Sequence, residues 1–452
     1  MKRVVSLVIG MILLLSTMTF LGCKNKVSFN EYTEYEQFRF YCYYTPPQAN
    51  VGTGDYANNP TYHTEEQYKY IAECGFNYAK PVLENSFEAQ VEVLAGLQKY
   101  GIKVNITDAS LIHMMDLYLN GYDDDSEAIK ANKELFKRNY EVYKQYDNFS
   151  GVDVADEPHY SRFEALGKVH DFYRTIDTTH DYRVNLLCYS PTTLLGTINY
   201  ATYLNDAVDI TKMSRLCFDS YPLNSDGTVK ESHIANNAEV AEKAKEKGID
   251  WDCFILTYQH MFYTNPKNYD DIAWQVYVPM AFGCRGILPF VYMTPLNTTD
   301  KYYAMISRDG KPTQIYYSMQ EVIKEVRAFE HMYMNSEWMG TMLYVADEDY
   351  PNKSFEMVAN PLQSHPRIKK LKATADLMIG TYKDKDNRDG FLLVNASAPS
   401  KDIENEVVIT FDDATHVMLY KKGRKLIVEL DKGTLKTDMG SGEGYYVIPF
   451  NA

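Results

Sequence analysis

Eight short apolar runs recur between residues 38 and 292, and a segment with helical periodicity separates each run from the next. The runs are Phe38–Tyr44, Phe76–Val82, Lys103–Thr107, Gly151–Ala155, Arg183–Tyr189, Arg215–Tyr221, Asp252–Tyr258 and Arg285–Tyr292. Buried strands that alternate with amphipathic helices are typical of a parallel sheet built from βα units. Because there are eight such units and no glycine-rich phosphate-binding motif, the pattern favours a closed (β/α)8 barrel over an open doubly wound sheet.

Helix boundary signals agree with this alternation. Thr64 and Gln67 have the spacing of a capping box, and Gly75 follows the apolar stripe of the same helix as a stop signal. Ser86 is expected to cap the next helix, and Gly248 is expected to end a later one. The order of helix, glycine and short apolar strand therefore repeats along the barrel region.

After the eighth helix, expected from Thr313 to about Glu337, the helical periodicity is lost. Short β-rich segments joined by turn residues follow, which predicts a small β-sandwich over residues 339–452. These segments are Gly340–Ala346, Asp376–Tyr382, Gly390–Asn395, Val407–Phe411, Val417–Tyr420, Lys425–Leu430 and Tyr445–Phe450. The lysine-rich run Lys369–Lys372 is expected to be a solvated loop.

The first 23 residues have the features of a targeting segment. Lys2 and Arg3 precede the apolar stretch Val4–Leu15, which is short for a membrane span, and Phe20-Leu-Gly-Cys23 follows it. This segment resembles a bacterial lipoprotein signal, although Phe20 replaces the usual leucine. The resemblance implies a lipid on Cys23 and an exported protein that is anchored to the cell membrane and faces outward. A tether over residues 24–37 would then lead to the barrel, which the alternating pattern predicts over residues 38–338. An ordinary secretory signal or an uncleaved anchor is the alternative.

Composition narrows the class of partner. The chain has 46 Lys and Arg against 61 Asp and Glu, a net charge of −15, which argues against nucleic acid or an anionic membrane surface as the main partner. It has 39 Tyr but only 3 Trp, and tyrosine rings suit the faces of sugars. The seven cysteines form no Cys/His cluster with metal spacing, so we expect no metal and no cofactor.

In a (β/α)8 barrel, chemistry takes place at the C-terminal ends of the strands, so polar residues there are the candidates. The residues predicted to share this cavity are Glu84, Asp108, Asp156, Glu157, Tyr189, Asp219, Tyr221, Tyr258, Gln259, His260 and Tyr292. Carboxylates, amides and phenol rings in one cavity suit the binding of an oligosaccharide or polysaccharide.

The most specific motif is Gly151-Val-Asp-Val-Ala-Asp-Glu-Pro158, which ends the fourth strand with two adjacent acids. A glycosidase needs one carboxylic acid to protonate the leaving oxygen and a second carboxylate as nucleophile or base. With Phe218–Pro222 and Gly283–Phe290, the motif resembles (β/α)8 glycoside hydrolases of the β-galactosidase and agarase type, whose acid/base glutamate ends strand four. The resemblance implies that Glu157 is the acid/base and Asp156 its polar neighbour. The alternative is that both acids cap the next helix or pair with Arg162.

Strand seven departs from that pattern, because Gln259 stands where the nucleophilic glutamate is expected. Three accounts follow. Another carboxylate serves, with Asp219 placed best and Glu84 or Asp108 behind it, and a wide separation from Glu157 then favours inversion. Alternatively, an acetamido group of the substrate is the nucleophile, or the barrel has lost catalysis and only binds glycan.

Overall fold

The computed structural model describes residues 28–81, 86–187, 198–259, 266–297, 302–347, 349 and 352–452. Residues 32–451 form one compact unit, which contains both the barrel and the β-rich region. None of the helices in the described part of the chain combines the length and the apolar character that a membrane span requires.

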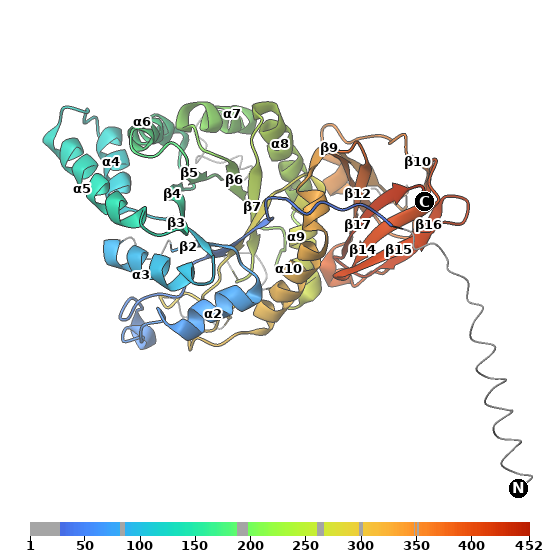
Figure 1. Ribbon diagram of the computed structural model, residues 1–452, viewed down its shortest axis with the longest axis horizontal. Helices are drawn as coiled ribbons and strands as arrows, with labels where there is room; N and C mark the ends of the chain where they lie inside the picture. The colour runs from blue at the N-terminus through green and yellow to red at the C-terminus, as the bar shows by residue number, and fades with distance from the viewer. Residues whose placement is uncertain are drawn as a thin grey trace, which may run out of the picture. The chain divides into compact units, whose positions relative to one another are not determined.

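Eight parallel strands form the first sheet, in the order β5-β4-β3-β2-β1-β8-β7-β6 (Figure 1). They are β1 Arg39–Tyr43, β2 Tyr78–Lys80, β3 Lys103–Ile106, β4 Phe149–Asp156, β5 Asp181–Asn185, β6 Leu216–Asp219, β7 Trp251–Leu256 and β8 Gly286–Phe290. A parallel bridge between Leu186 and Phe218 joins β5 to β6, and the Leu186 N–H donates to the Cys217 carbonyl at 2.7 Å. The sheet is therefore closed into the predicted barrel, and each of the eight predicted runs contains one of its strands.

Helices follow the strands around the barrel. They are α2 Glu65–Cys74, α3 Phe87–Gln98, α4 Ala109–Leu119, α5 Glu127–Tyr143, α6 Phe163–Arg174, α7 Tyr200–Thr211, α8 Ser232–Lys247, α9 Tyr269–Ala281 and α10 Gln314–Tyr333. The Thr64 side chain accepts the Gln67 N–H at the start of α2, and Gly75 ends that helix with a left-handed φ of 99°. Ser86 caps α3 and Gly248 ends α8, so the local signals in the sequence correctly mark these ends.

The C-terminal region is a β-sandwich of two antiparallel sheets, ordered β10-β13-β16 and β15-β14-β17-β12-β11-β9. Its strands are β9 Ser336–Tyr344, β10 Ile368–Ala373, β11 Leu377–Asp384, β12 Asp389–Asn395, β13 Asn405–Phe411, β14 His416–Lys421, β15 Arg424–Glu429, β16 Thr434–Met439 and β17 Gly444–Phe450. Apolar side chains from both sheets, including Phe391, Val407, Phe411 and Val447, form a single core.

Three details of this region differ from the prediction. Lys369–Lys372 is not a loop but lies in β10, an edge strand whose lysines are exposed, as suits a strand that borders solvent. Strand β16, Thr434–Met439, is absent from the predicted segments because its sequence has no strong apolar run. Helix α10 ends at Tyr333, not near Glu337, because buried and exposed side chains already alternate from Ser336 onward in the period-two pattern of β9.

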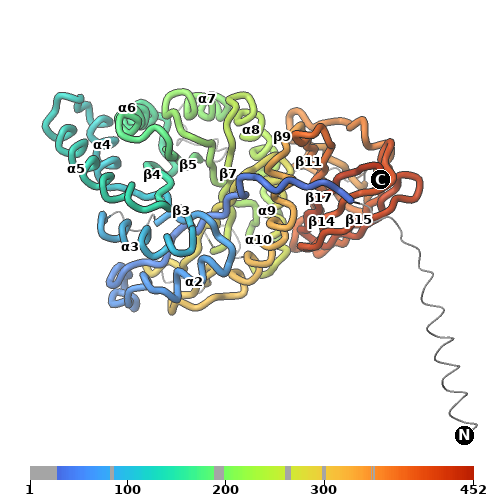
Figure 2. The backbone as a smooth tube through the Cα atoms, viewed as in Figure 1, coloured from blue at the N-terminus to red at the C-terminus, as the bar shows by residue number. Residues whose placement is uncertain are grey.

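Strands β11 and β12 of the sandwich pack against α9 of the barrel. Figure 2 shows α9 and α10 on the side of the barrel that is next to the sandwich. The Trp274 indole donates to the Ala396 carbonyl at 3.4 Å, and the Thr341 hydroxyl donates to the Ala281 carbonyl at 2.7 Å. At Gly380 an added Cβ would stand 2.4 Å from the Ala281 carbonyl oxygen, so only glycine permits this contact. The six-stranded sheet of the sandwich is thus fixed to the wall of the barrel.

Candidate active site

A cleft of about 220 Å³ lies at the C-terminal ends of strands β1, β3, β4 and β5. Its lining residues are Tyr43, Tyr44, Thr107, Ile112, Asp153, Val154, Ala155, Asp156 and Asn185. This is the end of the barrel at which the sequence predicts the chemistry.

A bulge in β4 brings two of its acids into the same cleft. Asp153 pairs with Arg183 of β5 and Asp156 pairs with Asn185, and the register shifts between Asp153 and Ala155. In a regular strand, residues three apart face opposite sides of the sheet. The shift lets Asp153 and Asp156 both line the cleft.

The surroundings of Asp156 disfavour the ionised form of its carboxyl group. Although its side chain is open to solvent at the mouth, the surrounding protein atoms desolvate it, and Asp153 and Glu157 repel its charge. Together these effects raise the pKa of Asp156 to about 6, against the hydrogen bond from Asn185 and the charge of Lys80, which lower it. The carboxyl group thus titrates close to neutral pH.

Glu157 directly follows β4 with a left-handed backbone, at a φ of 45°. Its N–H donates to the Asn185 carbonyl at 2.9 Å, and its side chain is exposed. A non-glycine residue in this conformation costs about 1–3 kcal/mol and is found preferentially at functional sites. The backbone of β4 therefore presents the Glu157 carboxylate at the barrel mouth.

The following helices do not use these two acids as caps. Arg162 is the N-cap residue of α6, and the side chain of His159 accepts the Ser161 N–H at the start of the short 3-10 helix Tyr160–Arg162. Within the part of the chain that the structure describes, Arg162 forms no ion pair with Asp156 or Glu157. The arrangement favours the functional interpretation of the motif over the capping one.

Asp219 ends β6, and its N–H donates to the Leu186 carbonyl at 3.1 Å. The phenol of Tyr221 is buried, and burial together with the charges of Asp219, Asp156 and Glu157 raises the pKa of Tyr221 well above its usual value. The ring of Tyr221 also lies 5.7 Å from that of Phe290 in β8. Glu157 and Asp219 thus both lie at the C-terminal ends of barrel strands, although neither is among the residues that line the cleft.

Asp108 has a different environment. It is buried and caps α4, where it accepts hydrogen bonds from the Ser110 N–H at 2.9 Å and from the Ser110 hydroxyl. Its other oxygen accepts from Asn139 at 2.9 Å and from the Tyr143 hydroxyl at 2.8 Å. These contacts favour a structural role for Asp108, so we leave it out of the proposed catalytic groups.

The two predicted tyrosines of strands seven and eight are buried. Tyr258 belongs to the apolar layer that closes the barrel top, and Arg308 donates to its hydroxyl at 3.5 Å. Tyr292 packs edge-on against Phe76 at 5.6 Å, and its phenol lies near Cys74 of α2. This places Tyr292 between the strands and the outer helices, away from the cleft.

Four predicted residues, Cys23, Glu84, Tyr189 and His260, lie outside the described residues. Gln259 is described and half-buried just after β7. The roles that the sequence predicts for these five residues therefore stay predictions.

Sequence reasoning missed the polar groups that support the cleft. Lys80 at the end of β2 is fully buried, forms an ion pair with Asp153, and donates to the Asn185 side-chain oxygen at 3.1 Å. Asn185 in turn donates to Asp156 at 3.2 Å. The two-residue periodicity of a β-strand could have revealed Lys80. Tyr78 and Lys80 are alternate residues of one short strand and therefore share its inner face.

A second polar cluster fills the barrel below the cleft. Asp252 of β7 accepts from Arg39 at 2.9 Å and from Arg183 at 2.8 Å, and both arginines are buried. Arg183 also donates to the Tyr41 hydroxyl at 2.8 Å, and the pKa of Asp252 is held far below its usual range by the two guanidinium groups, against the effect of burial. Arg39 also pairs with Glu36 and Asp250, so the cluster is an ion network separate from the residues that line the cleft.

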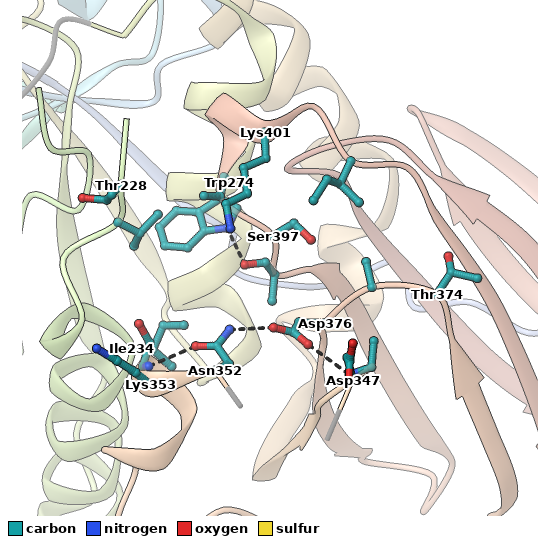
Figure 3. A pocket seen from close by; sticks show the side chains of 17 residues that line it. Thr228, Ile234, Trp274, Asp347, Asn352, Lys353, Thr374, Asp376, Ser397 and Lys401 are labelled. Carbon is teal, nitrogen blue, oxygen red and sulfur yellow. Dashed lines mark hydrogen bonds between the residues drawn. The ribbon is translucent and has the colours of Figure 1, made fainter. Parts of the chain in front are cut away.

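A larger hollow of about 570 Å³ lies between the loop after β6, α9 and the sandwich (Figure 3). Its carboxylate Asp376 accepts the Ala346 N–H at 3.0 Å and the Asn352 side chain at 2.9 Å. These bonds hold the sandwich loops in place, so we assign the hollow no catalytic role. No cluster of three potential metal ligands occurs among the described residues.

No protein-family model and no curated protein matches the chain. Solved structures similar to it include glycoside hydrolases. A β-galactosidase from Halorubrum lacusprofundi is 14% identical with a TM-score of 0.43, over 64% of this chain and 58% of that chain. A β-galactosidase from Marinomonas ef1 is 10% identical with a TM-score of 0.47, over 65% of this chain and 60% of that chain. An α-amylase from Anoxybacillus is 9% identical with a TM-score of 0.49, over 91% of this chain and 97% of that chain.

The chain thus spans 58% and 60% of the lengths of the two β-galactosidases. The fold itself is defined by the eight parallel strands that close into a barrel.

Proposed function

We propose that the protein is a glycoside hydrolase with Glu157 as general acid and Asp219 as the second catalytic carboxylate. The observation that carries this proposal is that Glu157 directly follows β4 and Asp219 ends β6, at the end of the barrel where chemistry takes place on this fold. Glycosidic cleavage requires two carboxyl groups on either side of the scissile bond, and the cleft lined by Asp156 lies beside these two residues at the end of β4.

In this mechanism, Glu157 transfers its proton to the glycosidic oxygen as the bond from that oxygen to the anomeric carbon breaks. Asp219 accepts a proton from a water molecule, whose oxygen attacks the opposite face of the anomeric carbon. Asp156 accepts a hydrogen bond from a substrate hydroxyl. Because Gln259 is an amide and cannot be a nucleophile, another carboxylate must serve, and with Asp219 as the base for water the reaction inverts the anomeric configuration.

The substrate is an oligosaccharide or polysaccharide outside the cell. This part of the proposal is supported by the lipoprotein-like segment ending at Cys23 and by Tyr43 and Tyr44 in the lining of the cleft. Attachment through a lipid on Cys23 would keep the barrel at the outer face of the membrane.

A glycan-binding lipoprotein without catalysis is the second candidate. Gln259 at the end of strand seven favours it, because the amide removes the nucleophile that the related barrel pattern supplies. The cleft and its tyrosines would then hold a sugar without cleaving it.

Release of reducing sugar from a panel of plant, microbial and host glycans separates the two candidates. We expect product from the native protein, and at least a hundredfold less from Glu157→Gln and from Asp219→Asn, with Asp55→Asn in an exposed turn as the matched control. No product on any glycan, together with binding of one glycan that survives in Glu157→Gln, would identify a receptor instead.

A further inference from the structure

Lys80 is an unusual residue for a barrel wall because its charge has no access to water. Its side chain is fully buried, and its ammonium lies 5.7 Å from the centroid of the Tyr41 ring. The ion pair with Asp153 and the hydrogen bond to Asn185 are its polar contacts in the described structure. Burying a lysine is costly unless such partners are present.

The contact with Lys80 fixes the orientation of the Asn185 amide. An ammonium group only donates hydrogen bonds, so the Asn185 oxygen must face Lys80. The amide nitrogen consequently faces Asp156, to which it donates at 3.2 Å. A buried cation on β2 therefore determines how a side chain on β5 holds the carboxylate of β4.

Asp156 lies in a crowded electrostatic environment. The titratable groups that face it are Asp153 and Glu157 from β4 and its end, Lys80 from β2, Tyr43 and Tyr44 from β1, and Tyr221 from the segment after β6. Three carboxylates thus share one nearby cation, which is itself paired. A change in either member of that pair must alter the charge balance at Asp156.

We propose that the buried Lys80–Asp153 ion pair is a positioning device for the reaction, which acts on the bound sugar through Asn185 and the carboxylate of Asp156. The inference rests on the proposed hydrolase function. Lys80 itself, with no exposed surface, does not touch the substrate.

A role in stability alone does not account for this arrangement. The buried cluster around Asp252 is a separate ion network, which pairs Arg39 and Arg183 with other acids. Replacing a buried ion pair by apolar groups of similar volume is often neutral or stabilising, so Lys80 and Asp153 are not required merely to fill space. Their chain of contacts ends at Asp156, which lines the cleft.

The test is the pH profile of kcat/KM for Lys80→Met and Asp153→Asn, measured on the glycan that the native enzyme cleaves. We expect the acidic limb of this profile near pH 6, where Asp156 ionises. Loss of the cation makes Asp156 keep its proton to higher pH, so this limb should move up by about 0.5–1 pH unit in Lys80→Met. Loss of the neighbouring anion should move the same limb down by a similar amount in Asp153→Asn. Lys103→Met, a lysine at the opposite end of a barrel strand, is the control and should leave the limb in place.

Each single variant leaves one charge buried alone, so circular dichroism and thermal melting must show that it folds. The double variant Lys80→Met/Asp153→Asn removes both charges, so the acidic limb of its pH profile should lie near the native position. Its kcat should fall about tenfold, because the Asn185 amide loses its fixed orientation. Limbs that do not move, or that move in the same direction in both single variants, would overturn the inference. Absence of turnover by the native protein would instead reject the proposed function.

Discussion

Replacing Asp156 by asparagine should stabilise the protein, and only at pH values where the native carboxyl is ionised. The folded-state pKa is raised from 3.8 to about 6, so ionisation is less favourable in the folded than in the unfolded chain. The native protein therefore loses stability as the pH rises from about 4 to about 6. A difference of about two pKa units corresponds to about 3 kcal/mol, and because water reaches the side chain we expect about 1–2 kcal/mol.

The assay is urea unfolding of the native protein and of Asp156→Asn at pH 4 and at pH 8. The variant should be more stable by about 1–2 kcal/mol at pH 8 and by little at pH 4. Asp55→Asn is the control, and it should change stability by less than about 0.5 kcal/mol at both pH values. A variant that is less stable than the native protein at pH 8, or a difference that is the same at both pH values, would refute the electrostatic account of the cleft.

Three further predictions concern the barrel around the cleft. Asp252→Asn leaves two buried arginines without their anion and should lower the free energy of unfolding, measured in urea, by about 3–5 kcal/mol at pH 7. Because the pKa of Asp252 is depressed in the folded protein, this loss should shrink only below about pH 4, and a loss under about 1 kcal/mol would contradict the ion cluster. Gly151→Ala should cost about 2 kcal/mol or more in the same assay, because the new Cβ would lie 2.2 Å from the Asp181 carbonyl oxygen in a strand with a φ of 138°, and native-like stability would show that β4 runs differently. Burial lowers the pKa of His233 to about 3, so native stability should fall by about 1.4 kcal/mol per unit as the pH drops below about 6.5; His233→Gln should lose this slope, and an unchanged slope would assign it to other groups.

The barrel is predictable from the sequence because its signals are local. A capping threonine and Gly75 delimit α2, and the apolar run Asp252–Tyr258 differs from β7 by one residue at its start and two at its end. Each of these signals depends on residues within about a dozen positions. The eightfold repetition then leaves a closed barrel as the natural arrangement.

The polar interior is not predictable in the same way. Charges such as Lys80 and Asp252 appear in the sequence as interruptions of apolar runs. Whether such a charge is buried and paired depends on a distant strand, as for Asp252 and Arg39, which are 213 residues apart. The sequence alone does not show which residues of two strands so far apart along the chain lie next to each other.

The candidate site shows the same limit. The Asp-Glu-Pro motif locates the acids at the end of β4, which is a local conclusion. That Asp153 and Asp156 line one cleft depends on a bulge defined by pairing with β5. Similarly, β10 was missed because its exposed lysines are typical of loops, and only its pairing with β13 shows that it is an edge strand.

The most direct test of the central claim compares aryl glycosides with different leaving groups, made with the sugar identified in the glycan panel. A 2,4-dinitrophenyl leaving group departs without a proton, whereas a methylumbelliferyl group departs faster with one. If Glu157 is the general acid, Glu157→Gln should lose at least a hundredfold in kcat/KM on the methylumbelliferyl glycoside and less than about tenfold on the dinitrophenyl glycoside. Equal losses on both substrates, or no loss on either, would contradict the assignment of Glu157.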